Sequence, residues 1–262
     1  MARIKRMLTG ALPPLDVHGW PWAARELTRP VDGVRSWTVI TAALSPLLLT
    51  VGWLVAGAFQ PLSYSPMRQT VSVMAGYTGT DRWIMTWAML LTGVCYILTA
   101  SGMGALWLPA RILLVVAGLC SIGIALSPEP VTGPTAVHLA WTSLGCATIA
   151  VWPAIVAWRA PPVLAAVSGR NAIVVTAVFA AMAGWVMFEI WFGHDLGLAE
   201  RLTASTQSAW PFVVALTWHR ATEPQPVSAA AAAVSWPPPD TAPALRSAAE
   251  YGSQGSSPSR QR

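Results

Sequence analysis

The ionisable side chains of this sequence gather near the ends of long apolar segments. Glu200, Thr203 and Gln207 follow one another at i, i+3 and i+7, so a helix would carry them as one polar stripe. Glu189 and Gln207 each lie inside an apolar segment. A charge at the end of a membrane helix reaches water, whereas one that lies a turn or more inside must pair or line a cavity. These residues therefore predict either a polar pocket or buried structural ion pairs.

Further charged residues are expected at the same membrane depth, so the predicted pocket also includes residues outside this stripe. The eight candidate ligand-binding residues are Arg68, Asp81, Arg82, His138, Glu189, Glu200, Arg201 and Gln207. Their expected role is electrostatic recognition, for which arginine is the side chain best suited to an anionic head group. The alternative is that Glu189 and Arg201 form structural ion pairs and that the others are solvated loop charges.

Familiar catalytic and metal-binding motifs are missing from the sequence. It contains no GxSxG nucleophile elbow, no phosphate-binding glycine loop and no HExxH pair. Zinc needs three or four converging ligands, and the spacing of His138 and His194 fixes no such set. The cysteines lie in apolar runs without CxxC spacing, which does not support a disulfide framework. We therefore expect no catalytic residue, no metal and no cofactor.

The composition points to a membrane protein. Of the 262 residues, 54% are hydrophobic and 10% are charged, whereas soluble domains carry about 25% charged residues. Six apolar segments are suited to cross a bilayer as helices, which takes about 20 residues each. They cover residues 37–59, 83–104, 107–126, 136–158, 171–192 and 200–218. Because lipid offers no partner to an open backbone, the predicted fold is an all-α bundle of six transmembrane helices.

The distribution of Arg and Lys predicts the topology. With six helices both chain ends share one side, and that side holds all of the 16 Arg and Lys residues except Arg68, Arg82 and Arg201. The positive-inside rule then places both termini in the cytoplasm, and the expected location is a bacterial inner membrane. The predicted parts are a cytoplasmic N-terminal segment, a transmembrane domain and a disordered cytoplasmic tail rich in Ala, Pro and Ser, at residues 1–36, 37–220 and 221–262.

The loop at residues 60–82 is the long polar interruption between the apolar segments, and this topology places it outside the membrane. Ser65 and Pro66 suit the first positions of a helix. The apolar residues from Met67 onward repeat at i, i+4, i+7 and i+8, which predicts a short extracytoplasmic helix. Thr80 is the expected cap of the next helix, with an acidic residue in its first turn. The short helix either closes a pocket or rests on the bundle surface.

The same loop resembles a known family. The stretches Tyr64–Ser72 and Thr80–Met85 look like DUF998, a bacterial family of membrane proteins that is defined as a domain of unknown function. The further agreeing positions are Trp53–Gly57, His138, Gly197–Arg201 and the pair Trp210 and Pro211. This sequence departs from the family motif at Ser65, where Asp would be expected. The resemblance covers residues 37–220 and implies the six-helix architecture, but no reaction.

We predict a membrane protein that binds a lipid or small ligand, or docks a partner protein, at an outward-facing polar pocket. Nucleic acid is not an expected partner. The alternative is a small transporter or permease component, in which Glu189 or Glu200 would carry a proton or cation. The third possibility is a membrane enzyme acting on lipid, with His138 as a base that Glu189 or Glu200 orients.

Overall fold

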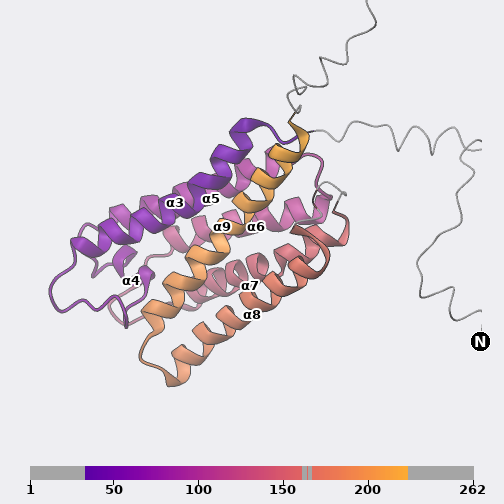
Figure 1. Ribbon diagram of the computed structural model, residues 1–262. Helices are drawn as coiled ribbons and strands as arrows, with labels where there is room; N and C mark the ends of the chain where they lie inside the picture. The colour runs from indigo at the N-terminus through magenta and orange to yellow at the C-terminus, as the bar shows by residue number, and fades with distance from the viewer. Residues whose placement is uncertain (1–32, 161–163, 165–166, 224–262) are drawn as a thin grey trace, which may run out of the picture. The chain divides into compact units, whose positions relative to one another are not determined.

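The computed structural model describes residues 33–160, 164 and 167–223, and this part of the chain contains helices and no strand. Six helices are long and one is short (Figure 1). The long helices are α3 (Ser36–Ala58), α5 (Trp83–Gly102), α6 (Leu108–Leu126), α7 (Ala136–Trp158), α8 (Gly169–Phe192) and α9 (Leu196–Thr222). The short helix α4 (Val71–Ala75) lies between α3 and α5 in the chain. The all-α prediction is confirmed for the described residues.

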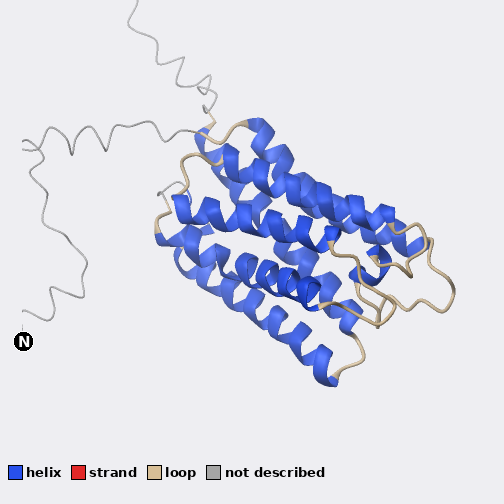
Figure 2. Ribbon diagram, turned by 180° about the vertical axis from the view of Figure 1, so that it is seen from behind, coloured by secondary structure: helices blue, strands red, loops and turns tan. Residues whose placement is uncertain are grey.

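The six long helices pack as a closed ring. Each of α3, α5, α6, α7, α8 and α9 contacts the next one in the chain, and α9 returns to contact α3. Figure 1 shows α9 running beside α3. The start of α3 and the end of α9 meet, because the His219 Nδ1 lies 2.8 Å from the Val34 carbonyl oxygen. The loops that contain α4 and residues 127–135 gather at the opposite end of the bundle, which we call the α4 end (Figure 2).

Five of the long helices have the length and composition of membrane spans, as expected for a multi-pass membrane protein. These five are α3, α5, α6, α7 and α8. Helix α9 is longer than any of them but is not in this group, because Glu200, Arg201 and several hydroxyl side chains make its first half polar. That all six long helices span the membrane therefore stays a prediction.

Helices α8 and α9 bury opposite kinds of surface. Helix α8 is apolar and fully buries only Ala172 and Phe179, so most of its side chains are exposed or partly exposed. Helix α9 buries polar side chains, among them Arg201, Thr203 and Gln207. A polar helix face is tolerated in an apolar setting when neighbouring protein shields it and supplies hydrogen bonds. The neighbours of α9 on both sides supply that shield.

Close helix contacts occur at glycines of α5 and α6. A methyl carbon at Gly93 of α5 would lie 2.5 Å from the Gly118 carbonyl oxygen of α6. The reverse substitution at Gly118 would bring the same clash, at 2.6 Å from the Gly93 oxygen. Small residues let helix backbones approach in this way. By contrast, no atom lies within 4 Å of the corresponding position at Gly184 in α8.

The predicted helix boundaries agree with the structure to within a few residues, but two predicted starts are wrong. The short helix begins at Val71 after a Thr70 cap, and not at Ser65. The reason is that Arg201 takes the Pro66 carbonyl oxygen, which a helix would need as an internal acceptor. Helix α5 begins at Trp83 without a side-chain cap from Thr80.

Gln60 explains why Thr80 does not cap α5. The Thr80 N–H donates to the Gln60 side-chain oxygen at 3.1 Å, and the Gln60 amide donates back to the Thr80 carbonyl at 3.0 Å. These bonds fix the chain in a non-helical form, and Asp81 follows with a φ of 47°. The predictions for the N-terminal segment and the tail fall mainly on residues 1–32 and 224–262, which lie outside the described residues.

Candidate functional site

The second turn of α9 holds the loop that precedes α4. Arg201, with 5% of its surface exposed, donates from Nη1 to the carbonyl oxygens of Pro66 and Gln69. The same nitrogen lies 2.8 Å from the Gly197 carbonyl oxygen, and Nη2 donates to the Tyr64 hydroxyl. The guanidinium carbon also lies 5.6 Å from the centre of the Trp53 ring. One buried cation therefore organises the loop from Tyr64 to Gln69.

Gly197 makes this contact possible because it has no side chain. A methyl carbon at Gly197 would lie 2.3 Å from the Gln69 carbonyl oxygen and 2.6 Å from that of Pro66. The next residue extends the contact, since the Leu198 N–H donates to the Met67 carbonyl oxygen at 3.0 Å. The stretches around Tyr64–Ser72 and Gly197–Arg201 are thus two halves of one packing unit.

Glu200 serves the other side of the same loop. Its Oε2 accepts from the Val71 N–H at 2.9 Å, at the first residue of α4. Thr70 caps the helix by accepting from the Val73 N–H at 3.4 Å. A carboxylate beside the first N–H groups of a helix satisfies donors that have no partner within the helix. Consecutive side chains of α9 therefore fix the loop and α4 from two directions.

His138 joins α4 to α7. Its Nδ1 lies 2.7 Å from the Ser127 carbonyl oxygen, and its Nε2 lies 3.0 Å from the Ser72 hydroxyl. A carbonyl can only accept, so Nδ1 carries the proton, and in the neutral ring Nε2 then accepts from Ser72. Both side chains are buried, with exposures of 3% for His138 and 5% for Ser72. The result is a hydroxyl bonded to an imidazole nitrogen at a buried position.

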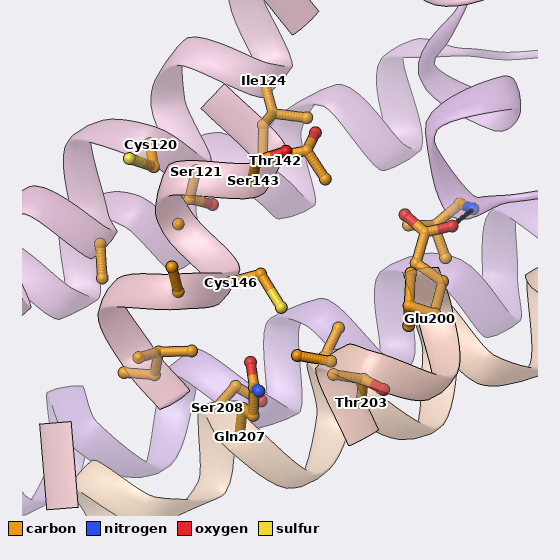
Figure 3. A pocket seen from close by; sticks show the side chains of 18 of the residues that line it. Cys120, Ser121, Ile124, Thr142, Ser143, Cys146, Glu200, Thr203, Gln207 and Ser208 are labelled. Carbon is orange, nitrogen blue, oxygen red and sulfur yellow. Dashed lines mark hydrogen bonds between the residues drawn. The ribbon is translucent and has the colours of Figure 1, made fainter. Parts of the chain in front are cut away.

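A cavity of about 350 Å³ lies inside the ring of helices and next to α4. Its volume falls within the range of small-molecule sites, which is about 300–1,000 Å³. The walls are mainly apolar and come from α5, α6, α7, α8 and α9, with Val71 and Ser72 of α4 at one end. Figure 3 shows Cys146 and Gln207 facing the hollow from α7 and α9, and Glu200 near one end of it.

The cavity has a mouth on the side of the bundle. The lining residues Leu139 of α7 and Met187 and Ile190 of α8 are 45%, 51% and 48% exposed. The second half of α8 buries no residue, whereas Phe179 in its first half is buried. Helix α8 is held to α9 in its middle, where Gln207 donates to the Phe179 carbonyl oxygen at 3.4 Å. The opening therefore lies between α7 and the second half of α8, at the level expected to contact lipid.

The eight predicted residues do not form one cluster. Glu200 and Gln207 line the central cavity, and His138 reaches it only through Ser72. Arg201 faces a separate hollow beside α3. Their proposed role in ligand binding stays a prediction.

The remaining predicted residues lie in the loops or at helix ends. Glu189 accepts from the Trp185 indole at 3.0 Å and from the Asp195 N–H at 2.9 Å, which closes the turn between α8 and α9. The Arg82 guanidinium carbon lies 4.3 Å from the centre of the Trp83 ring. Arg68 and Asp81 are exposed. Among the described residues, no group of three or more His, Cys, Asp or Glu side chains could hold a metal ion.

Burial perturbs two ionisable groups in these loops. Burial raises the pKa of the Tyr64 hydroxyl, although the neighbouring Arg201 charge opposes that shift. Tyr64 thus stays a neutral hydroxyl against the guanidinium. Burial also raises the pKa of the Glu129 carboxyl, and His138 opposes the rise. The backbone of Glu129 supports the α4 end, since its carbonyl oxygen accepts from the Tyr77 N–H at 2.9 Å.

Sequence reasoning missed Ser72, Tyr64 and Trp53 as members of these sites. All three lie in stretches that carry the family resemblance, but none is ionised near neutral pH, so a search for charges passes over them. Gly197 was visible only as part of a motif. Its importance depends on a contact with residues more than a hundred positions earlier, which spacing cannot reveal.

Comparison with known proteins gives a family match. No curated protein and no solved structure matches this chain. The DUF998 family model, described as a protein of unknown function, matches residues 43–217. That range takes in both the Tyr64–Ser72 stretch and the Gly197–Arg201 stretch. The chain therefore belongs to the DUF998 family of proteins of unknown function.

Proposed function

We propose that this protein binds a lipid or a similar amphiphile in its central cavity, with the α4 end facing outward. The observation that carries the proposal is a cavity of about 350 Å³ whose side opening is formed by exposed apolar residues of α7 and α8. A ligand that enters through such an opening comes from the hydrocarbon and not from water. Its apolar part matches the walls, and its polar part has hydroxyls and Glu200 as partners.

We also propose that all six long helices cross the membrane, which puts both termini in the cytoplasm. Helix α9 is long enough at 27 residues, since about 20 residues cross the hydrocarbon. Its polar face packs against protein, with Thr203 donating to the Met182 carbonyl oxygen of α8 at 3.3 Å. Among the described residues, more arginines lie at the end opposite α4 than at the α4 end, which supports a cytoplasmic location for that opposite end. Those at the opposite end are Arg35, Arg111, Arg159, Arg170 and Arg220, and those at the α4 end are Arg68, Arg82 and Arg201.

Native mass spectrometry of the gently released protein tests lipid binding. Ala183 lines the cavity and Ala180 is exposed one turn earlier on the same helix without lining it. Ala183→Phe fills the cavity, whereas Ala180→Phe adds the same apolar volume on the outside. We expect a lipid of defined mass on the wild type and on Ala180→Phe, and its loss in Ala183→Phe. A bare wild-type protein, or equal lipid on all three, would contradict the proposal.

A second candidate function, hydrolysis of an ester lipid, is favoured by the Ser72 and His138 pair. Ser72 lines the cavity, and its hydroxyl lies 3.0 Å from His138 Nε2, within reach for proton transfer. The Ser127 carbonyl would hold the ring in the required tautomer. The role that the sequence analysis gave to Glu189 or Glu200 would then belong to this carbonyl.

The reaction would follow the usual course of a serine nucleophile. Ser72 Oγ bonds to the ester carbonyl carbon while its proton passes to His138 Nε2. The C–O bond to the leaving alcohol then breaks, and the alcohol takes that proton from the histidine. Water enters in the same way, with His138 as its base, and releases the acid and the free serine.

A fluorophosphonate probe tests for an activated serine in isolated membranes. We expect covalent labelling of the wild type, loss of labelling in Ser72→Ala, and strong loss in His138→Gln. Ser143 also lines the cavity and serves as the control, so Ser143→Ala should label as the wild type does. An unlabelled wild type, or labelling that survives in Ser72→Ala, would reduce the pair to a structural contact. A transporter would use the same cavity and would lose substrate movement in Glu200→Gln.

A further inference from the structure

A second cavity, of about 370 Å³, lies beside the end of α3 that faces the α4 loop. Trp53, Leu54 and Gly57 of α3 form one wall, and Gln60, Tyr64 and Arg201 form the other. It shares no lining residue with the central cavity. Two consecutive residues of α9 therefore belong to different cavities: Glu200 lines the central cavity and Arg201 lines the second one.

Two buried donors at this second cavity have no partner among the described residues. They are Arg201 Nε and Trp53 Nε1. A buried N–H that lacks an acceptor destabilises the fold, and most such groups in proteins are paired with protein or with a bound molecule. The two groups belong to neighbouring side chains, since the Arg201 guanidinium carbon lies 5.6 Å from the centre of the Trp53 ring. Both side chains line the cavity, although the two nitrogens themselves are covered. An acceptor that enters the cavity receives both donors once the side chains turn toward it.

Among the described residues, no acidic side chain forms an ion pair within 4 Å of Arg201. The ion pair within 4 Å that occurs in the described residues joins His219 to Glu223, at the other end of α9. Glu200 is close enough for an electrostatic interaction with Arg201, but its carboxylate bonds to the Val71 N–H and forms no direct pair with the guanidinium. The carbonyl oxygens around Arg201 are dipoles without net charge. A guanidinium that is 95% buried favours an anion over a neutral acceptor, because buried charges are normally compensated.

We propose that the second cavity binds a phosphate group, with Arg201 Nε and Trp53 Nε1 donating to its oxygens. Planar guanidinium groups and indole donors suit the several acceptor oxygens of a phosphate. The surroundings favour a phospholipid head group as its source, because Leu54 in the cavity wall is 54% exposed and continues an apolar face with Val51 and Leu47. The acyl chains would lie along that face of α3. This site does not depend on a ligand in the central cavity.

Thermal unfolding of the purified full chain in mild detergent tests the site. Phosphatidylglycerol is compared with diacylglycerol of the same acyl chains, which lacks the phosphate, and with inorganic phosphate alone. Trp53→Phe keeps an aromatic ring for packing and removes the donor. The control is Trp210→Phe, because the Trp210 indole is another buried donor without a partner but lines neither cavity.

We expect phosphatidylglycerol to raise the unfolding temperature of the wild type and of Trp210→Phe more than diacylglycerol does. In Trp53→Phe the apparent affinity should fall about ten-fold or more, the usual effect of losing a hydrogen bond to a charged group. An equal effect of inorganic phosphate would support the anion site with a soluble source in place of a lipid. The proposal is overturned if the phosphate makes no difference, or if Trp53→Phe binds as the wild type does, because water then satisfies both donors. Ala183→Phe changes only the central cavity. If this variant loses a lipid from the central cavity, the phosphate site in the second cavity is unaffected, so the two proposals are tested separately.

Discussion

Replacement of Arg201 by glutamine should release the loop before α4 without unfolding the bundle. The guanidinium is the shared donor for the carbonyl oxygens of Pro66 and Gln69 and for the Tyr64 hydroxyl. Glutamine places its donor nitrogen two bonds closer to the backbone and lacks the fork of donors, so it cannot reach all three. The remaining ties are the Glu200 bond to the Val71 N–H and the Met67 bond to the Leu198 N–H. The structure therefore predicts a local effect at the α4 end.

The size of the effect follows from the two loop carbonyls. A hydrogen bond to a charged group contributes about 1.5–3 kcal/mol net. Pro66 is exposed and Gln69 is partly exposed, so water can replace part of the loss and the lower figure applies. Two such bonds give about 3 kcal/mol for the free energy of local opening. Since about 1.4 kcal/mol corresponds to a factor of ten, the loop amides should exchange about 100-fold faster.

Hydrogen–deuterium exchange followed by mass spectrometry measures this opening. Peptides that cover residues 64–75 report on the loop and α4, and peptides from α6 report on the rest of the bundle. The matched control is Arg220→Gln, which removes an exposed arginine from the last turns of the same helix. Exchange in the loop that rises by less than about five-fold, or no more than in the control, would refute the role assigned to Arg201. Equal acceleration in α6 would show global destabilisation instead of local release.

Three further predictions test the packing, the electrostatics and the topology. Gly93→Ala should lower the free energy of unfolding by about 1–3 kcal/mol because it forces α5 away from α6, whereas Gly184→Ala, with no atom within 4 Å, should be near neutral in thermal unfolding. Glu129→Gln should raise the unfolding temperature at about pH 8 and change little at about pH 4: burial raises the pKa of this acid above its ordinary 4.5, so its ionisation destabilises the fold as the pH rises through both values. A membrane-impermeant maleimide should label Tyr77→Cys in intact cells and leave Arg220→Cys unlabelled, in a background without the native cysteines; the opposite pattern would invert the proposed orientation.

The sequence was sufficient to predict the helices because membrane spans depend on a local property. Residues 136–158 form α7 as predicted, since a run of apolar residues of that length has helix as its stable form in lipid. The short helix was harder. Its apolar residues Val71, Met74 and Ala75 are buried as their spacing suggests, but its start depends on Thr70 and on a distant arginine. Local capping preferences could not choose between Ser65 and Thr70, because Arg201 decides the matter.

The predicted site shows the same limit more strongly. A search for polar and charged side chains within apolar segments or at their ends found Glu200, Arg201 and Gln207, which all line cavities. Neighbouring side chains on a helix point about 100° apart, so Glu200 and Arg201 can face different cavities. The search could not show this, because the positions of the cavities depend on how the other helices and the loop pack. It also grouped Glu189 with these residues, although this carboxylate is engaged by the turn that follows α8.

The neighbouring charges of Glu200 and Arg201 give a physical reason for the polar first half of α9. Charged side chains inside a bundle lower the tendency of a helix to enter the membrane, and α9 falls outside the group of clear spans for that reason. If these side chains only held the loop and α4 in place, a neutral residue at position 200 could cap α4 and a shorter apolar residue at position 201 could pack against the loop. These charges place one ionisable side chain at each cavity, a carboxylate at the central one and a guanidinium at the second. If both charges served only the loop, replacing them together by a neutral pair would leave every bound lipid in place; a loss of different lipids from the two single variants is the result that separates recognition from support.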